Sequence, residues 1–202
     1  DAIFINSSSN ISVIGGSVGP VVDNHPQFAS WPTGTHITNI LVDGVTFHDV
    51  SRTSTSGHVE CLQVAGGVGV TIRNSTFTRC AVFDLSITEY NGSGAPTGYL
   101  IENNVFDTAT SGGFFSLDFN PNATDFRDFV IRNNSATQAF TLTGVPKLTN
   151  VRVIANVAPL SQNGCDAAIS YSRNVWTAAK CGSTDLKAAS GFRNADALDL
   201  HL

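Results

Sequence analysis

The sequence predicts an all-β protein folded as a single-stranded parallel β-helix, a solenoid of about seven coils. Three observations lead to this fold. A short motif recurs along the 202 residues, at first every 29 or 30 residues. The segments before several copies of the motif alternate apolar and polar residues, which is the periodicity of a strand. No stretch carries a sustained 3.6-residue apolar stripe, so any helices are expected to be few and short.

The repeated motif reads apolar residue, any residue, Gly or Asn, two residues, apolar residue. Its third position falls at residues 15, 44, 74, 103, 133, 155 and 173, with spacings of 29, 30, 29, 30, 22 and 18 residues. A sharp bend between two strands needs a residue that tolerates positive φ, and Gly and Asn do so at the lowest cost. The third position is therefore predicted to be the bend of each coil, with weaker copies at Ala155 and Arg173.

One residue after the bend, four consecutive copies of the motif carry an asparagine, at Asn104, Asn134, Asn156 and Asn174. If the coils stack, these side-chain amides are expected to form a hydrogen-bonded ladder. Strand-only units of this length fit a solenoid, whereas a seven-bladed propeller needs about 40 residues per blade.

Each full coil should contribute further strands between the bends. Four such segments are predicted to stack on one sheet: 60–64, 82–87, 114–119 and 140–143. Their alternation places Phe83, Leu85 and Ile87 on the inner face and Asp84 and Ser86 on the outer one. We therefore expect an apolar interior and a polar outer column. The whole chain, 1–202, is expected to be one domain, with 159–202 as an irregular, disulfide-closed C-terminal end.

Four cysteines lack the spacing of a zinc site. Cys165 and Cys181, sixteen residues apart and each beside a glycine, suit a loop-closing disulfide. Cys61 and Cys80 either form a second bridge or are buried thiols. The even number of cysteines, few lysines and many hydroxyl and amide side chains favour an oxidising, secreted or extracellular setting.

The charge balance excludes some partners. Eleven Lys and Arg against sixteen Asp and Glu give a net charge of −5, which argues against nucleic acid as a ligand. No apolar run is long enough for a membrane span. Because Asp1 opens directly onto a strand-like segment, we expect the natural chain to have been trimmed.

Several phrases together resemble a known family. The segments 40–47, 58–63, 70–77 and 101–106, and the terminal 191–202, look like bacterial right-handed parallel β-helix repeat proteins of the pectate-lyase-like superfamily. The resemblance implies a right-handed coil and, for many members, export. The amphipathic N-terminal cap of that family is missing here. The fold alone leaves the function open, because the scaffold carries lyases, hydrolases, esterases, epimerases, tailspikes and adhesins.

The residues that most suggest a site are Glu60, Asp84, Asp118 and His58, with Gln63 beside them. If Asp84 and Asp118 stack directly, their side chains lie within roughly 5 Å, because adjacent strands are about 4.8 Å apart. Two such carboxyl groups could serve as acid and base in glycoside hydrolysis. Alternatively they hold Ca²⁺ for a lyase whose base is His58 or Arg79; the cofactor is therefore either none or Ca²⁺.

Simpler interpretations stand beside these. Asp and Ser on an exposed sheet face often only solubilise the protein, and Glu60 with Gln63 can satisfy loop backbone. His48 and Asp49 suggest a metal pair, yet adjacent residues on a strand point to opposite faces. Arg79, Glu89 and Tyr90 are candidate substrate-binding residues; Tyr90 could stack on a sugar ring. Trp31 and Trp176 could do the same but fit a core or capping position better.

The leading functional hypothesis is a secreted, carbohydrate-active protein that binds an extended polysaccharide, with or without cleaving it as a lyase or glycoside hydrolase. The alternative is a non-catalytic surface or structural solenoid, such as an adhesin, tailspike or filament segment, that associates end to end or as a trimer. Ice binding would need a flat threonine array, and Thr76, Thr78, Thr141 and Thr143 are too isolated to form one.

Overall fold

The computed structural model describes residues 3–30, 35–53, 59–89, 92–107, 115–120, 125–142, 145–159 and 164–191. Over these ranges the chain forms strands and no helix, and the strands pair in parallel in three sheets. Sheet A contains, in spatial order, β1 (Phe4–Asn6), β5 (Gln27–Ala29), β8 (Leu62–Ala65), β11 (Phe83–Thr88), β14 (Phe115–Phe119) and β17 (Phe140–Thr141).

The other two sheets are built in the same way. Sheet B contains β2 (Ser9–Ile14), β6 (Thr38–Asp43), β9 (Val68–Arg73), β12 (Thr97–Glu102), β15 (Phe126–Arg132), β18 (Leu148–Ile154) and β20 (Ile169–Ser172). Sheet C contains β3 (Ser17–Val18), β4 (Val21–Val22), β7 (Thr46–Ser51), β10 (Thr76–Cys80), β13 (Val105–Asp107), β16 (Ser135–Ala136), β19 (Val157–Ala158), β21 (Val175–Trp176) and β22 (Leu186–Lys187).

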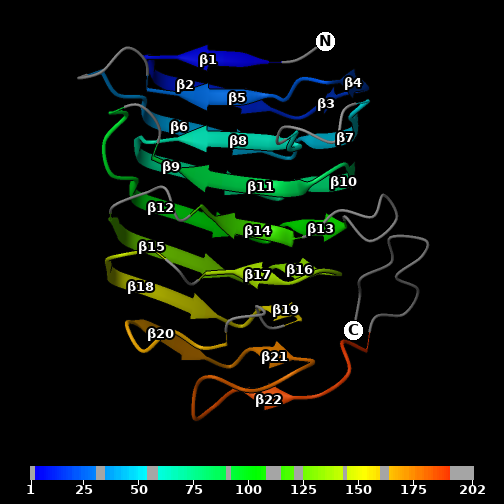
Figure 1. Cartoon of the computed structure of the whole chain (residues 1–202), viewed down its shortest axis with the longest axis vertical. Coiled ribbons are helices and arrows are strands. Elements are labelled where there is room, and N and C mark those ends of the chain that lie inside the picture. The colour runs from blue at the N-terminus through cyan, green and yellow to red at the C-terminus, as the bar shows by residue number, and fades with distance from the viewer. Residues whose placement is uncertain are drawn as a thin grey trace.

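The order of the strands in the chain explains the shape. From β1 to β19 the chain visits sheets A, B and C in turn, and each strand pairs with the strands one coil before and after it. Figure 1 shows the result, a stack of strands that runs along the long axis of the molecule. This arrangement fits the expected solenoid. The four segments predicted to share a sheet do so, as β8, β11, β14 and β17.

The predicted bends are confirmed by the backbone. The third position of every motif copy has positive φ, including the non-glycine residues Asn74, Asn103, Asn133, Ala155 and Arg173. The left-handed conformation breaks the strand between sheets B and C at the same place in each coil. Ala155 and Arg173 adopt it without the usual Gly or Asn, which shows that the stacked neighbours enforce the bend there.

The asparagine ladder is also confirmed, and it is fully buried. Asn104 donates to Asn134 Oδ1 at 3.0 Å, Asn134 to Asn156 Oδ1 at 2.9 Å, and Asn156 to Asn174 Oδ1 at 3.0 Å. Each of these amides also donates to a backbone carbonyl. Asp185 ends the ladder, where it accepts hydrogen bonds from Asn174, Trp176 and Gly182.

Apolar side chains from the three sheets fill the interior. Aromatic rings stack along the axis from coil to coil, as in the run Phe47, Phe77 and Phe106, with centroids 4.9 and 5.0 Å apart. Tyr99 stacks on Phe129 in the same way at 4.5 Å. Each coil therefore buries its inner face against its neighbours, as a solenoid must.

Two disulfides crosslink the described part of the chain: Cys61–Cys80 and Cys165–Cys181. The predicted Cys165–Cys181 bridge is confirmed, and of the two alternatives left open for Cys61 and Cys80 the structure shows the bridge; no described cysteine is free. In the segment after residue 159, β20, β21 and β22 continue sheets B and C beside the second bridge. Among the described residues no helix is long and apolar enough to cross a membrane.

Candidate functional site on the outer face of sheet A

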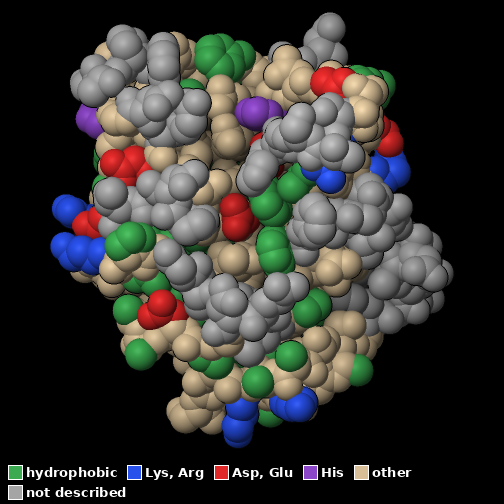
Figure 2. Space-filling view, viewed as in Figure 1, with side chains coloured by type: hydrophobic (Ala, Val, Ile, Leu, Met, Phe, Trp, Pro, Cys, Tyr) green, Lys and Arg blue, Asp and Glu red, His purple; other side chains and the backbone are tan. Residues whose placement is uncertain are grey.

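The outer face of sheet A carries a row of polar side chains that crosses five coils. Leu62, Leu85 and Leu117 point into the core, so the residues beside them point outward. The register aligns one outward residue from each of five strands, and we call this row the sheet A column: Gln27, Gln63, Ser86, Asp118 and Thr141. Figure 2 shows acidic and histidine side chains along the middle of this face.

The two aspartates of this face do not stack on one another, contrary to our expectation. Asp118 pairs with Ser86, and the flanking pairs Phe83–Phe115 and Leu85–Leu117 place Asp84 level with Ser116. Each carboxyl group therefore has a serine as its direct neighbour on the adjacent strand, which avoids direct stacking of like charges. Ser86 Oγ donates to Asp118 Oδ2 at 3.2 Å.

The outer face is polar, as predicted, but it is not open to solvent. Asp84 and Ser86 are fully buried, Ser116 is fully buried, and Asp118 is 5% exposed. Gln27, Gln63 and Thr141, nearer the ends of the column, are partly exposed. The simpler interpretation, that these acids only solubilise the surface, is therefore wrong, because a buried side chain contributes nothing to solubility.

Glu60 lies just before β8 and is also fully buried. Its Oε2 is 3.6 Å from Nδ1 of His25, which precedes β5 on the neighbouring coil. His25 is partly exposed, so the histidine connects the buried carboxyl group with the surface. Gln27, two residues after His25, donates a hydrogen bond to Gln63.

Burial sets the protonation of the two acids. It raises the pKa of Glu60 to about 7; a backbone hydrogen bond opposes this shift, and the charge of Asp118 adds to it. Burial likewise raises the pKa of Asp118 to about 6, against the opposing hydrogen bond from Ser86. Asp118 therefore ionises first, and its charge then delays the ionisation of Glu60.

The expected calcium site at Asp84 and Asp118 stays a prediction without structural support. Calcium takes about six to eight oxygen ligands. In the part of the chain that the structure describes, no group of three or more His, Cys, Asp or Glu side chains could hold a metal.

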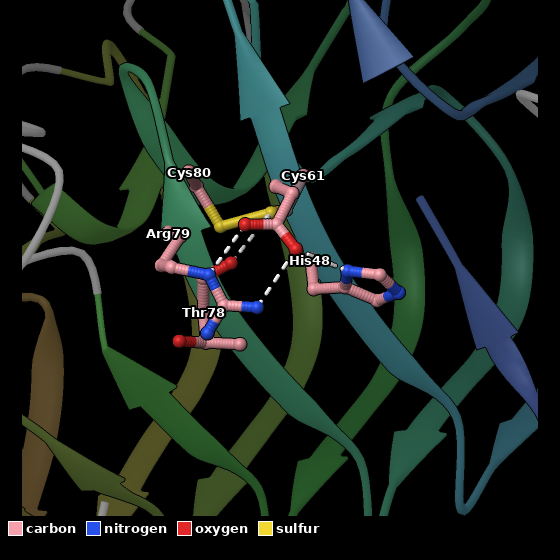
Figure 3. A network of polar contacts seen from close by, with 6 residues as sticks. His48, Cys61, Thr78, Arg79 and Cys80 are labelled. Atoms are coloured by element: carbon pink, nitrogen blue, oxygen red, sulfur yellow. Dashed lines mark hydrogen bonds and ion pairs between the residues drawn. A yellow bond between two sulfur atoms is a disulfide. The ribbon is translucent and has the colours of Figure 1, made fainter. Parts of the chain in front are cut away.

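Arg79 lies on a different sheet from the other candidates, and its role as a base or substrate ligand stays a prediction. It lies on β10 in sheet C, where its Nη2 donates to Asp49 Oδ2 at 2.7 Å. Figure 3 shows Arg79 beside His48 and near the Cys61–Cys80 bridge. The hydrogen bonds from Arg79 and His48 hold the pKa of Asp49 well below its usual range.

His48 and Asp49 also depart from expectation. They were expected on opposite faces, yet His48 Nδ1 lies 2.6 Å from Asp49 Oδ2. The cause is the backbone of Asp49, whose φ of 54° is left-handed and breaks the alternation of the strand. Arg79, one coil on, has the same conformation with φ of 53°.

Of the remaining candidate residues, one lies in the core, one lies beside the site, and three lie outside the described residues. Trp176 is fully buried in the core, as the preferred interpretation had it. Glu89 follows directly after the last residue of β11, a central strand of sheet A. His58, Tyr90 and Trp31 lie outside the described residues, so their roles stay predictions.

Sequence reasoning missed His25 and Gln27, and it placed Ser86 on the outer face without pairing it with Asp118. A signal existed for Gln27, because Gln27-Phe-Ala and Gln63-Val-Ala are two copies of one pattern. A second signal existed for the register. When Phe83-Asp-Leu-Ser is aligned with Phe115-Ser-Leu-Asp on the phenylalanines, each aspartate lies opposite a serine. His25 had no such signal, because it precedes a three-residue strand.

Comparison with protein-family models, with curated proteins and with solved structures found no match to this chain.

Proposed function

We propose that the protein binds an extended polysaccharide along the outer face of sheet A and hydrolyses its glycosidic bonds. One observation carries the proposal: Glu60 and Asp118, both buried, have pKa values raised to about 7 and about 6 at the same face. Perturbed carboxyl groups of this kind gather at functional sites. An acid and a base with separated pKa values are what glycoside hydrolysis requires.

The higher pKa makes Glu60 the proton donor. Glu60 gives its proton to the glycosidic oxygen while the bond from that oxygen to the anomeric carbon breaks. Asp118 accepts a proton from a water molecule whose oxygen bonds to the same carbon. Asp84 is a third carboxyl group at this face, level with Ser116 on the adjacent strand. His25, 3.6 Å from Glu60, returns a proton from solvent to the acid.

The finer assignment of the fold belongs to this proposal. We propose a right-handed β-helix of the pectate-lyase-like kind, secreted by a bacterium. Parallel strands joined by crossovers are right-handed in nearly all known cases, and two disulfides fit an oxidising compartment. A crystal structure tests the handedness of the coil directly, and a left-handed coil would contradict this assignment.

The test is incubation of the purified protein with a panel of neutral and acidic polysaccharides. We expect new reducing ends and no ultraviolet-absorbing unsaturated product, which a lyase would release. The rate should peak between about pH 6 and pH 7, because Asp118 must be ionised while Glu60 is still protonated.

Two substitutions test the roles. Glu60→Gln and Asp118→Asn should each lower kcat by about 100-fold or more, since general acid–base catalysis contributes that much. Glu102→Gln is the matched control, because Glu102 is paired with Arg132 on sheet B and should leave kcat unchanged. If no polysaccharide is bound or cleaved, or if the control loses as much as the other two, the proposal fails.

A second candidate function is a non-catalytic solenoid that associates end to end. It is favoured by Phe4 and Ile14, which are 63% and 71% exposed and lie on β1 and β2, the first strands of sheets A and B. Such edges invite strand pairing between molecules. Light scattering that shows one monomeric species at every protein concentration would exclude it.

A further inference from the structure

The outer face of sheet C carries buried polar side chains that the proposed function does not use. Phe77 and Phe106 stack in the core, so the residues that follow them, Thr78 on β10 and Asp107 on β13, point outward. Thr78 and Asp107 are paired in register on neighbouring strands. Both are buried, at 3% and 1% exposure. A hydroxyl group and a carboxyl group therefore lie on adjacent coils, shielded from solvent.

One oxygen atom of each of these side chains lacks a hydrogen-bond partner in the described structure. The two atoms are Thr78 Oγ1 and Asp107 Oδ2. The other carboxyl oxygen, Asp107 Oδ1, accepts from Oγ1 of Thr137 at 3.0 Å, on the coil at its other side. A hydroxyl donor and a carboxyl acceptor on adjacent strands are natural partners, as Thr137 and Asp107 demonstrate. Thr78 and Asp107 do not bond to each other, so both buried oxygens still need a partner.

The charged groups nearby do not supply that partner. Arg79 donates its hydrogen bonds to Asp49, and Asp107 acts on it only through its charge. His48, which pairs with Thr78 from β7, has its Nδ1 2.6 Å from Asp49 Oδ2. Figure 3 shows Thr78 beside His48 and Arg79. Among the described residues, no Lys, Arg or His forms a hydrogen bond or an ion pair with Asp107.

The chemistry of the two oxygens favours a cation as the partner. A carboxyl group removed from water is stabilised most by an opposite charge. Carboxyl and hydroxyl oxygens are the ligands that hard cations prefer. A divalent ion such as Ca²⁺ takes several acidic ligands, and the described residues contain no group of three or more His, Cys, Asp or Glu that could hold one. A single carboxyl group balances a single positive charge.

We propose that Asp107 Oδ2 and Thr78 Oγ1 bind a hard monovalent cation, of the class of Na⁺, on the outer face of sheet C. Asp107 balances the charge of the ion, and Thr78 contributes a hydroxyl lone pair. The ion links β10 to β13 and stabilises the folded protein as its concentration rises. This site lies on a different sheet from Asp118, so it does not rest on the proposed function.

The test compares the melting temperature of the protein in sodium chloride and in choline chloride at equal concentration. We expect a melting temperature about 3 °C higher in sodium chloride, because only the folded protein has the site and choline is too large to enter it. Calcium chloride at the same ionic strength should stabilise no more than sodium chloride does. A larger gain in calcium that is lost in Asp107→Asn would overturn the monovalent class.

Variants locate the effect. Asp107→Asn keeps the shape of the side chain but removes its charge, and it should abolish the gain in sodium chloride. Asp43→Asn is the matched control, because it removes the same charge from sheet B, where Asp43 pairs with Arg73; it should keep the gain. Should Asp107→Asn not fold, as judged by circular dichroism, Thr78→Val should lose the gain and Thr78→Ser, which retains the hydroxyl group, should keep it.

A crystal structure from sodium chloride gives the direct evidence. We expect an atom at about 2.4 Å from Asp107 Oδ2 and Thr78 Oγ1, closer than the roughly 2.7 Å of a water hydrogen bond. A water molecule at that place would overturn the proposal. Equal melting temperatures in the two salts would do the same, as would a sodium gain that survives both Asp107→Asn and Thr78→Val.

Discussion

Two buried carboxyl groups in this molecule have opposite electrostatic surroundings. Asp185 closes the asparagine ladder; burial alone would raise its pKa, but hydrogen bonds from Asn174, Gly182 and Trp176 lower it. Asp118, on the outer face of sheet A, accepts a hydrogen bond from Ser86, and burial raises its pKa to about 6. At Asp185 the hydrogen bonds from three residues outweigh the effect of burial, whereas at Asp118 the effect of burial outweighs the hydrogen bond from Ser86.

The comparison separates a structural position from a functional one. At Asp185 the fold stabilises the charged form, and the carboxylate holds the last coils together. At Asp118 and Glu60 the fold stabilises the protonated form at the expense of stability at neutral pH. This loss of stability places groups at one face that exchange protons near pH 7. Acid–base catalysis requires such groups, whereas a structural hydrogen-bond ladder does not.

The largest effect is expected from removing the acid of the ladder. Asp185→Ala should lower the free energy of unfolding by about 4 kcal/mol, because several buried donors, among them Trp176 Nε1 and Gly182 N, lose their acceptor and each costs about 1–3 kcal/mol. Urea unfolding measures this loss. Asp166→Ala, at a partly exposed turn, is the control and should cost much less.

The disulfide beside the site should come next. Replacing Cys61 and Cys80 by alanine opens a crosslink of 19 residues and should cost about 3 kcal/mol by the chain-entropy model. Because Cys61 adjoins Glu60, the same double variant should also lower the Glu60 pKa. Replacing Cys165 and Cys181 should cost a similar amount yet leave that pKa unchanged, and equal effects of both pairs on it would contradict the placement of the site.

The pH dependence of stability tests the raised pKa values directly. The folded pKa of Glu60 is about 7 against 4.5 for an unperturbed group, so the folded protein holds the proton more tightly than the unfolded chain does. The resulting stability is fully present below about pH 4.5 and is lost as pH rises to about 7, a fall of about 3 kcal/mol.

Glu60→Gln should flatten this fall, as followed by urea midpoints between pH 4.5 and pH 8. Asp185→Ala is the opposite test, because the pKa of Asp185 is lower in the folded protein than in the unfolded chain. Its carboxylate therefore contributes stability above the unfolded pKa, and that stability is lost only as the pH falls toward the folded pKa. A Glu60→Gln protein with the wild-type pH profile would show that the carboxyl group is not perturbed.

The smallest effect is expected on sheet B, where charges of alternating sign follow each other along the axis as Asp43, Arg73, Glu102 and Arg132. These side chains are exposed enough for salt to screen them. Arg73→Gln should shift the urea midpoint by little more than the error of measurement, and 1 M salt should remove the shift. A large shift would mean that surface pairs set the register.

Some features of the site were readable from sequence and others were not. The stacking of β8, β11, β14 and β17 followed from alternation, but the direct stacking of Asp84 on Asp118 was wrong. The serines that replace it could have been found by aligning the two phenylalanine-led segments. The contact between His48 and Asp49 could not, because a left-handed residue inside a strand removes the alternation on which the expectation depended.

The sequence by itself determined the repeat, the bends at Gly15 to Arg173, the asparagine ladder and the Cys165–Cys181 pair, but it left the state of Cys61 and Cys80 open. These features depend on backbone sterics and on contacts between adjacent coils, which resemble one another and therefore leave a periodic trace. Only the tertiary structure decided that Glu60, Asp84 and Asp118 are buried and that His25 reaches Glu60. Burial is a property of the whole folded chain and follows no fixed spacing in the sequence, so the pKa values of Glu60 and Asp118 left no pattern to read.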